Sequence, residues 1–133
     1  MDAKRALDAA AGDFEKAKAA LIAAGIAKAD KKGDRAIGAP YLEAYIHGGV
    51  GGRIGVLLDI GAETDFVTRS ETFREVAKNI AMHISFAAPE TVEQLLAQPF
   101  VRDESMTIEQ YLKTAITKLG ENIRVNKFTR YQI

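Results

Sequence analysis

The chain has 133 residues, of which 47% are hydrophobic and 27% are charged, and this predicts one globular core with at most a small appendage. Its 18 basic and 18 acidic residues cancel, which argues against direct binding of nucleic acid or of a membrane surface, because both require an excess of positive charge. The absence of cysteine excludes disulfide bridges and thiolate chemistry.

Residues 1–35 are predicted to form a small helical module and a linker. Two short helical segments are expected, and Asp13 is a suitable N-cap for the second. Leu21 lies on the apolar face of this second segment, which is predicted to end at Gly25. Two short helices bury little surface, so the main core must be formed by the residues that follow.

Residues 36–133 are predicted to form an α+β core domain. Residues 41–47 and 53–60 are apolar runs with the two-residue period of strands, and the glycine-rich residues 48–52 between them are typical of a hairpin connection. A third strand is expected at residues 122–131, where apolar and polar side chains alternate. These three strands would complete a small antiparallel sheet.

Helices are predicted in the interval between the hairpin and the last strand. Ser70 is a suitable N-cap for a long amphipathic helix, and a short helix is expected at residues 91–97. Thr107 and Gln110 form a capping-box pair at the start of the last helix, which Gly120 ends. The predicted fold class is therefore α+β, a small N-terminal helical module followed by a three-stranded antiparallel sheet packed against helices.

Residues suited to catalysis or metal binding are few. The two histidines, His47 and His83, lack partners at zinc-binding spacing and are expected to be structural residues at or near the surface. Glu63 and Asp65 could hold Mg²⁺ or act as an acid and base pair only if the strand persisted through both, so solvated turn carboxylates are the favoured interpretation. The glycine-rich loop precedes a strand, whereas a phosphate-binding loop precedes a helix. No enzyme activity, metal site or cofactor is expected.

Residues 64–67 form an acidic and aromatic turn between a strand and a helix. Phe66 falls outside the alternating apolar set of the preceding strand, and two interpretations stay open. The ring is either folded back over the end of the helix or exposed as an anchor for another protein, since aromatic residues dominate interface energetics.

The order of several motifs resembles that of elongation factor Ts, the nucleotide-exchange factor of elongation factor Tu. The resemblance covers essentially the whole chain, and its Thr-Asp-Phe-Val and Leu-Gly-Glu-Asn-Ile motifs are specific to the family. The matching segments are residues 1–7, 45–47, 53–57, 63–69, 98–101 and 118–123. The resemblance implies that residues 1–35 are a partial, UBA-like N-terminal module.

In that family an Asp-Phe pair enters the GTPase domain of elongation factor Tu, and the ring wedges beside helices bordering the nucleotide site. The resemblance implies that this chain binds the GDP form and promotes GDP release by displacing the Mg²⁺ that holds the phosphates. The residues implied in this displacement are Thr64, Asp65, Phe66 and Val67. The further contacts implied are Leu119 and Gly120, at the turn into the last strand, and Met1.

Three departures from the family pattern affect what is expected. The first helix of the N-terminal module would precede Met1, and Gly61-Ala62 replaces the usual Asn-Cys. The helical insertion usual before residues 98–100 is nearly missing, so one core subdomain is present. Short relatives of this kind resemble dimers in which two chains replace the two subdomains, and a homodimer is therefore expected.

The alternative hypothesis is a ribosome- or RNA-associated binding domain. It would use Lys28, Lys31 and Lys32 together with the basic last strand, which carries Arg124, Lys127 and Arg130. Protection of a sheet edge against aggregation is the favoured interpretation of the strand charges. No apolar run approaches the roughly 18 residues of a membrane span, and the start lacks a leader, so the cytoplasm or an organelle matrix or stroma is the expected location.

Overall fold

A computed structural model describes residues 14–133. The predictions for the first helical segment, the Asp13 cap and Met1 lie outside these residues. The elements are, in chain order, α2 (Phe14–Asp30), β1 (Ala39–His47), β2 (Ile54–Ala62), α3 (Asp65–Thr68), α4 (Glu71–Ala87), α5 (Val92–Ala97), β3 (Pro99–Phe100), β4 (Asp103–Thr107), α6 (Ile108–Leu119) and β5 (Ile123–Gln132).

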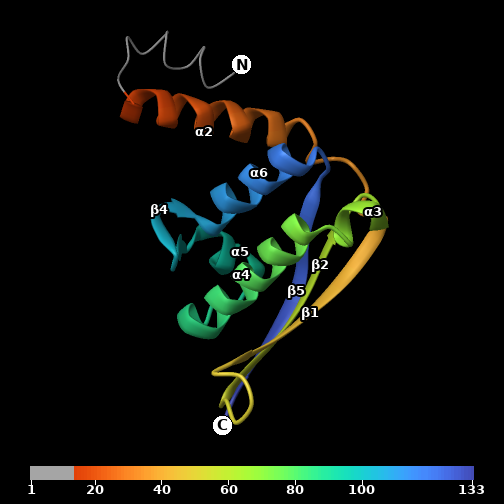
Figure 1. Ribbon diagram of the computed structural model, residues 1–133, viewed down its shortest axis with the longest axis vertical. Helices are drawn as coiled ribbons and strands as arrows, with labels where there is room; N and C mark the ends of the chain where they lie inside the picture. The colour runs from red at the N-terminus through yellow and green to blue at the C-terminus, as the bar shows by residue number, and fades with distance from the viewer. Residues whose placement is uncertain (1–13) are drawn as a thin grey trace.

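The predicted three-stranded antiparallel sheet is confirmed, with β2 at its centre and the order β1-β2-β5. β1 pairs with β2 from Ala39 opposite Ala62 to His47 opposite Ile54, across the predicted glycine-rich hairpin. β5 pairs with β2 up to Ala62 opposite Ile123, and one bulge shifts the register beside Asp59. The helices lie to one side of the sheet (Figure 1).

The core lies between this sheet and helices α4 and α6. Alternate residues of β2 are buried, as the two-residue period predicts, and Leu58 and Ile60 are both fully buried. Phe73 of α4 is also fully buried, and its ring meets the Tyr41 ring of β1 edge-on at a centroid distance of 5.3 Å. The apolar stripe of α4 therefore packs directly on the inner face of the sheet.

The predicted helix caps around this core are confirmed. The Ser70 side chain accepts a hydrogen bond from the Phe73 amide at the start of α4. Thr107 and Gln110 form the reciprocal capping box of α6, and Gly120 adopts the left-handed conformation, with φ of 78°, at its end. Gly120 thereby turns the chain directly from α6 into β5.

The prediction that the second N-terminal helix ends at Gly25 is wrong, because α2 continues to Asp30. The additional turn packs on α6, where Ala29 is 2% exposed. The Thr117 hydroxyl of α6 also donates a hydrogen bond of 2.6 Å to the Gly25 carbonyl oxygen. Tertiary packing therefore overrides the weak helix propensity of glycine.

A second, two-stranded sheet formed by β3 and β4 was not expected from the sequence. β3 has only two residues, too few to show alternation, and it begins at Pro99. Its register places Phe100 opposite Asp103. The centroid of the buried Phe100 ring lies 4.4 Å from that of the Tyr111 ring of α6. This small sheet therefore packs on the core beside α6.

His83 is fully buried, whereas the sequence placed it at or near the surface. Its Nδ1 accepts a hydrogen bond of 3.2 Å from the Val101 amide, and its Nε2 lies 2.8 Å from Gln98 Oε1. The neutral ring with its proton on Nε2 satisfies both contacts. Burial lowers the pKa of His83 below 6.5, although the hydrogen bond to Gln98 partly opposes this shift.

The lowered pKa of His83 predicts that the stability of the fold depends on pH. Because its pKa is lower in the folded chain than in the unfolded chain, the unfolded state binds more protons as the pH falls below about 6.5. We expect the free energy of unfolding to fall from pH 7.5 to pH 5, and to fall less in His83→Asn. Urea unfolding at each pH measures this. An equal decline in both proteins would assign the effect to other groups.

Candidate functional site

The turn at residues 64–67 is observed as the start of a single helical turn, α3, at the end of β2. Val67 and Thr68 are 6% and 5% exposed and anchor this turn to the core. The Arg69 amide closes it by donating to the Asp65 carbonyl oxygen at 3.1 Å. Phe66, between the anchoring residues and the strand, is 83% exposed.

The exposure of Phe66 decides between the two interpretations of its ring. A ring folded back over the helix would be buried, as Phe73 is seven residues later. Instead the Phe66 ring projects into solvent from a backbone held by its buried neighbours. Asp65 beside it is also exposed, and its carboxylate is 3.5 Å from Arg69 in an ion pair that water screens strongly. The turn presents an apolar ring and a carboxylate side by side.

Glu63 and Asp65 do not converge on a common site. Glu63 Oε2 accepts a hydrogen bond of 2.9 Å from the backbone amide of Asn122 and lies 3.7 Å from the Arg35 guanidinium. Asp65 is directed to Arg69 instead. The two carboxylates therefore form separate contacts, in line with their interpretation as turn residues rather than as an acid and base pair.

The structure brings the turn at residues 64–67 together with the Leu119-Gly120 turn. Glu121, directly after Gly120, accepts hydrogen bonds from the Thr64 amide at 2.9 Å and the Thr64 hydroxyl at 2.7 Å. Gly120 is exposed, while Leu119 packs partly against the core. Glu121 lies in the Leu-Gly-Glu-Asn-Ile motif, but its contact with Thr64 was not predicted, because no local pattern reports a pairing between residues 57 positions apart.

The linker between α2 and β1 is tied to the same end of the sheet. The buried Asn122 side chain donates to the carbonyl oxygens of Gly33 at 3.3 Å and Arg35 at 2.8 Å. Gly38 passes close to Glu63, whose carbonyl oxygen would lie 2.8 Å from any Cβ at this position. A side chain larger than hydrogen at residue 38 would therefore push the linker away from the turn.

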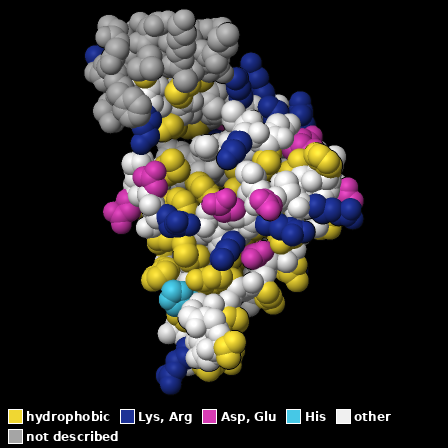
Figure 2. Space-filling model, in the orientation of Figure 1, with side chains coloured by type: hydrophobic (Ala, Val, Ile, Leu, Met, Phe, Trp, Pro, Cys, Tyr) yellow, Lys and Arg dark blue, Asp and Glu magenta, His cyan; other side chains and the backbone are white. Residues whose placement is uncertain are grey.

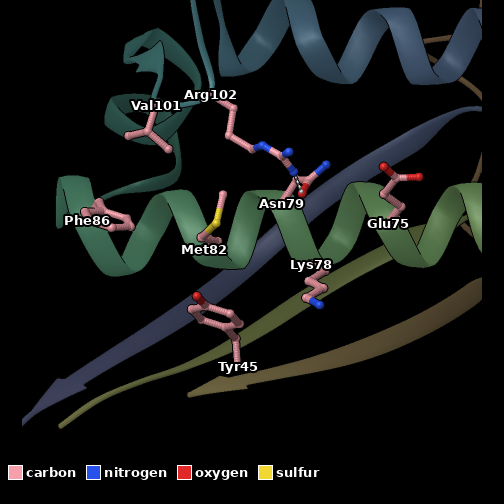
Figure 3. A pocket seen from close by; sticks show the side chains of 8 residues that line it. All are labelled: Tyr45, Glu75, Lys78, Asn79, Met82, Phe86, Val101 and Arg102. Atoms are coloured by element: carbon pink, nitrogen blue, oxygen red, sulfur yellow. Dashed lines mark hydrogen bonds between the residues drawn. The ribbon is translucent and has the colours of Figure 1, made fainter. Parts of the chain in front are cut away.

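A hollow with a volume of about 770 Å³ lies beside α4. Figure 3 shows Met82 and Phe86 along one side of the helix, with Tyr45 reaching from β1 and Arg102 pointing toward Asn79. Arg102 donates a hydrogen bond of 2.9 Å to the Asn79 side-chain oxygen. None of the residues that line this hollow belongs to the turn at residues 64–67 or to the Leu119-Gly120 turn.

Basic and acidic groups are interspersed over the middle of the visible face in Figure 2, whereas several basic groups gather at its upper right, beside the residues drawn in grey. Two basic residues of β5 bind backbone oxygens of the chain itself. Arg124 donates to the Gly33 carbonyl oxygen at 3.0 Å, and Arg130 donates to the Ser85 carbonyl oxygen at 3.0 and 3.2 Å. These contacts occupy guanidinium donors that could otherwise bind phosphate, but they leave the positive charges in place.

Within residues 14–133, no three histidine or acidic side chains gather as a metal ion would need, and no helix is both long and apolar enough to cross a membrane. The chain is therefore a small α+β domain whose exposed aromatic turn is suited to contact with another protein.

Residues 63–133 match the family model described as Elongation factor TS. Over the whole chain, an elongation factor Ts of Nostoc sp. is 40% identical. An elongation factor Ts of Desulforamulus reducens and a chloroplastic one of Rhodomonas salina are each 36% identical over the whole chain. The chain belongs to the elongation factor Ts family. Members of this family are translation elongation factors, not enzymes, as the sequence analysis expected.

The relatives differ from this chain in length. The chain covers 41% of the Nostoc protein but 81% of the Desulforamulus and Rhodomonas proteins. The alignment with the Desulforamulus protein extends over 178 positions, so that relative carries residues with no counterpart among the 133 here. The alignment with the Nostoc protein, in contrast, extends over only 133 positions. The region that matches the family model begins at Glu63 and includes both turns of the candidate site.

Proposed function

We propose that this chain binds elongation factor Tu in its GDP form and promotes GDP release. The observation that carries the proposal is the 83% exposure of Phe66 on a turn anchored by buried neighbours. A large ring held in solvent on a fixed backbone contributes binding energy when a partner covers it, and aromatic side chains are frequent anchors of interfaces. Family membership supplies the identity of the partner.

The proposed mechanism needs no chemistry from the chain itself. Phe66 enters the partner beside its nucleotide site, while Asp65, Thr64 and Val67 support the contact and Leu119 with Gly120 adds a second one. Mg²⁺ in the partner requires nearly ideal octahedral geometry around the phosphates, so a small displacement there weakens GDP binding. This chain would accordingly act by binding energy alone.

The test is the release of fluorescent GDP from purified elongation factor Tu, with and without the chain. We expect faster release with the chain, and this acceleration should persist when the salt concentration is raised, because an apolar anchor is poorly screened. Binding of the chain to RNA is measured in the same buffers. RNA binding that falls steeply with salt, combined with unchanged GDP release, would favour the ribosome- or RNA-associated alternative.

We also propose a homodimer that forms through the outer face of the three-stranded sheet. The helices pack on the inner face, and the outer face carries several apolar side chains that no described residue buries. They are Leu42 at 64%, Leu57 at 49%, Ile46 at 52% and Tyr131 at 67% exposure. The β1–β2 and β2–β5 registers place these side chains on neighbouring strands, so a second copy could cover them together.

Leu57→Lys is expected to convert the dimer into a monomer, because it places a charge at the centre of this apolar face. The fold should persist, since the Leu57 side chain is half exposed. Val50→Lys, at the fully exposed hairpin tip, is the matched control and should stay dimeric. Sedimentation at micromolar concentration measures the masses. A parent chain that is monomeric across this range would contradict the dimer.

A further inference from the structure

The backbone pairing of β2 with β5 ends at Ala62 opposite Ile123, and side chains continue it. The next two pairs in the same register are Glu63 with Asn122 and Thr64 with Glu121. In the first pair the Glu63 carboxylate accepts a hydrogen bond of 2.9 Å from the backbone amide of Asn122. In the second pair the Glu121 carboxylate accepts from the Thr64 amide at 2.9 Å and the Thr64 hydroxyl at 2.7 Å. We call these reciprocal contacts the carboxylate clamp.

The clamp changes the role of Thr64 at the start of α3. The hydroxyls of Ser70, Thr91 and Thr107 each cap their own helix by accepting an amide hydrogen bond. Thr64 occupies the same N-cap position of α3, yet its hydroxyl makes no cap and donates to Glu121 instead. The start of α3 is therefore held by a residue from the other end of the chain and not by local capping.

This arrangement places the exposed Phe66 two residues beyond a fixed point. Thr64 is bound through both its amide and its hydroxyl, and Val67 is buried on the other side of the ring. Holding Phe66 from both sides restricts the backbone before any partner arrives, which lowers the entropy lost on binding. The same carboxylate follows Gly120 directly, so the two turns of the candidate site are held in one relative position.

We propose that Glu121, with Glu63, is a positioning residue that orders the Thr64 to Phe66 turn for binding and couples it to the Gly120 turn. This inference rests on the proposed exchange function and adds to it residues that act through Phe66. Glu121→Ala removes both contacts to Thr64. Glu121→Gln can keep both, because its amide oxygen accepts from the Thr64 amide and its NH₂ donates to the Thr64 hydroxyl.

The experiment compares GDP release from elongation factor Tu at subsaturating concentrations of the chain. Glu121→Ala is expected to lower the acceleration roughly threefold to tenfold, the range for lost hydrogen bonds, and Glu121→Gln should retain most of it. In a Phe66→Ala background, Glu121→Ala should change release by less than about twofold, because the ring that it positions is gone. Glu104→Ala, at an exposed position of β4, is the matched control.

Amide hydrogen exchange of the isolated chain tests the ordering directly. Glu121→Ala should accelerate exchange at Thr64 and Thr68 while leaving Leu58 in the central strand protected. Three results would each overturn the proposal. The first is unchanged protection at Thr64 and Thr68 in Glu121→Ala. The others are an equal fall in GDP release in both Phe66 backgrounds and a Glu121→Gln variant that is as weak as Glu121→Ala. A parent chain that fails to accelerate release would refute the exchange function, whereas amide exchange would still decide whether Glu121 orders the turn.

Discussion

Phe66→Ala is expected to abolish most of the acceleration of GDP release while leaving the domain folded. Truncating a central aromatic anchor costs about 1.5–4 kcal/mol of binding free energy, so the affinity for elongation factor Tu should fall by tenfold to about a thousandfold. Because the ring is 83% exposed, its loss removes almost no core contact. Fluorescent-GDP release and a thermal melt of each variant measure the two effects separately.

Phe86→Ala is the matched control for this prediction. Phe86 is another exposed phenylalanine, at 60%, but it lies near the end of α4 beside His47 and away from the turn at residues 64–67. It should leave GDP release unchanged. If Phe86→Ala impaired release as much as Phe66→Ala, the contact surface would extend over α4 and the assignment of Phe66 as the anchor would be wrong.

Thermodynamic linkage adds a second requirement. If the chain lowers the affinity of elongation factor Tu for GDP by some factor, GDP must lower the affinity of elongation factor Tu for the chain by the same factor. Phe66→Ala should reduce both factors together. If the variant bound both forms of elongation factor Tu more weakly but left the factor unchanged, Phe66 would contribute equally to the GDP-bound and the nucleotide-free complexes and would not drive release.

Local patterns in the sequence predicted the parts of the fold that local rules determine. The two-residue period of β2 predicted its buried face, and the Thr107 and Gln110 pair predicted the start of α6. Gly25 was misread because glycine in a helix is ambiguous, and the packing of Ala29 on α6 decided the outcome. β3 escaped prediction because two residues show no period.

The candidate site was predictable only in part, because it also depends on contacts between residues that lie far apart in the sequence. The pattern around Phe66 was compatible with either a buried or an exposed ring, and the resemblance to a family singled out residues 64–67. The contact of Thr64 with Glu121 joins residues 57 positions apart, so it depends on the register of β2 with β5. Sequence periodicity reports which face a residue occupies, but not the partner that a strand brings to it.

Phe73→Ala, the same chemical change seven residues after Phe66, is expected to have the opposite consequence. The Phe73 side chain is fully buried and packs edge-on against Tyr41, so truncation leaves a cavity between α4 and the sheet. Such changes cost about 3–5 kcal/mol, a large share of the 5–15 kcal/mol that stabilises a typical domain. Urea unfolding at fixed protein concentration measures the loss.

The conservative variant Phe73→Leu keeps most of the buried volume and should lose markedly less stability than the alanine variant, although it gives up the ring contact with Tyr41. At temperatures where Phe73→Ala remains folded, its acceleration of GDP release should approach that of the parent, because α3 and its ring are intact. A loss below about 1 kcal/mol in Phe73→Ala would mean that the core collapses around the missing ring. The two phenylalanines would then no longer separate folding from binding.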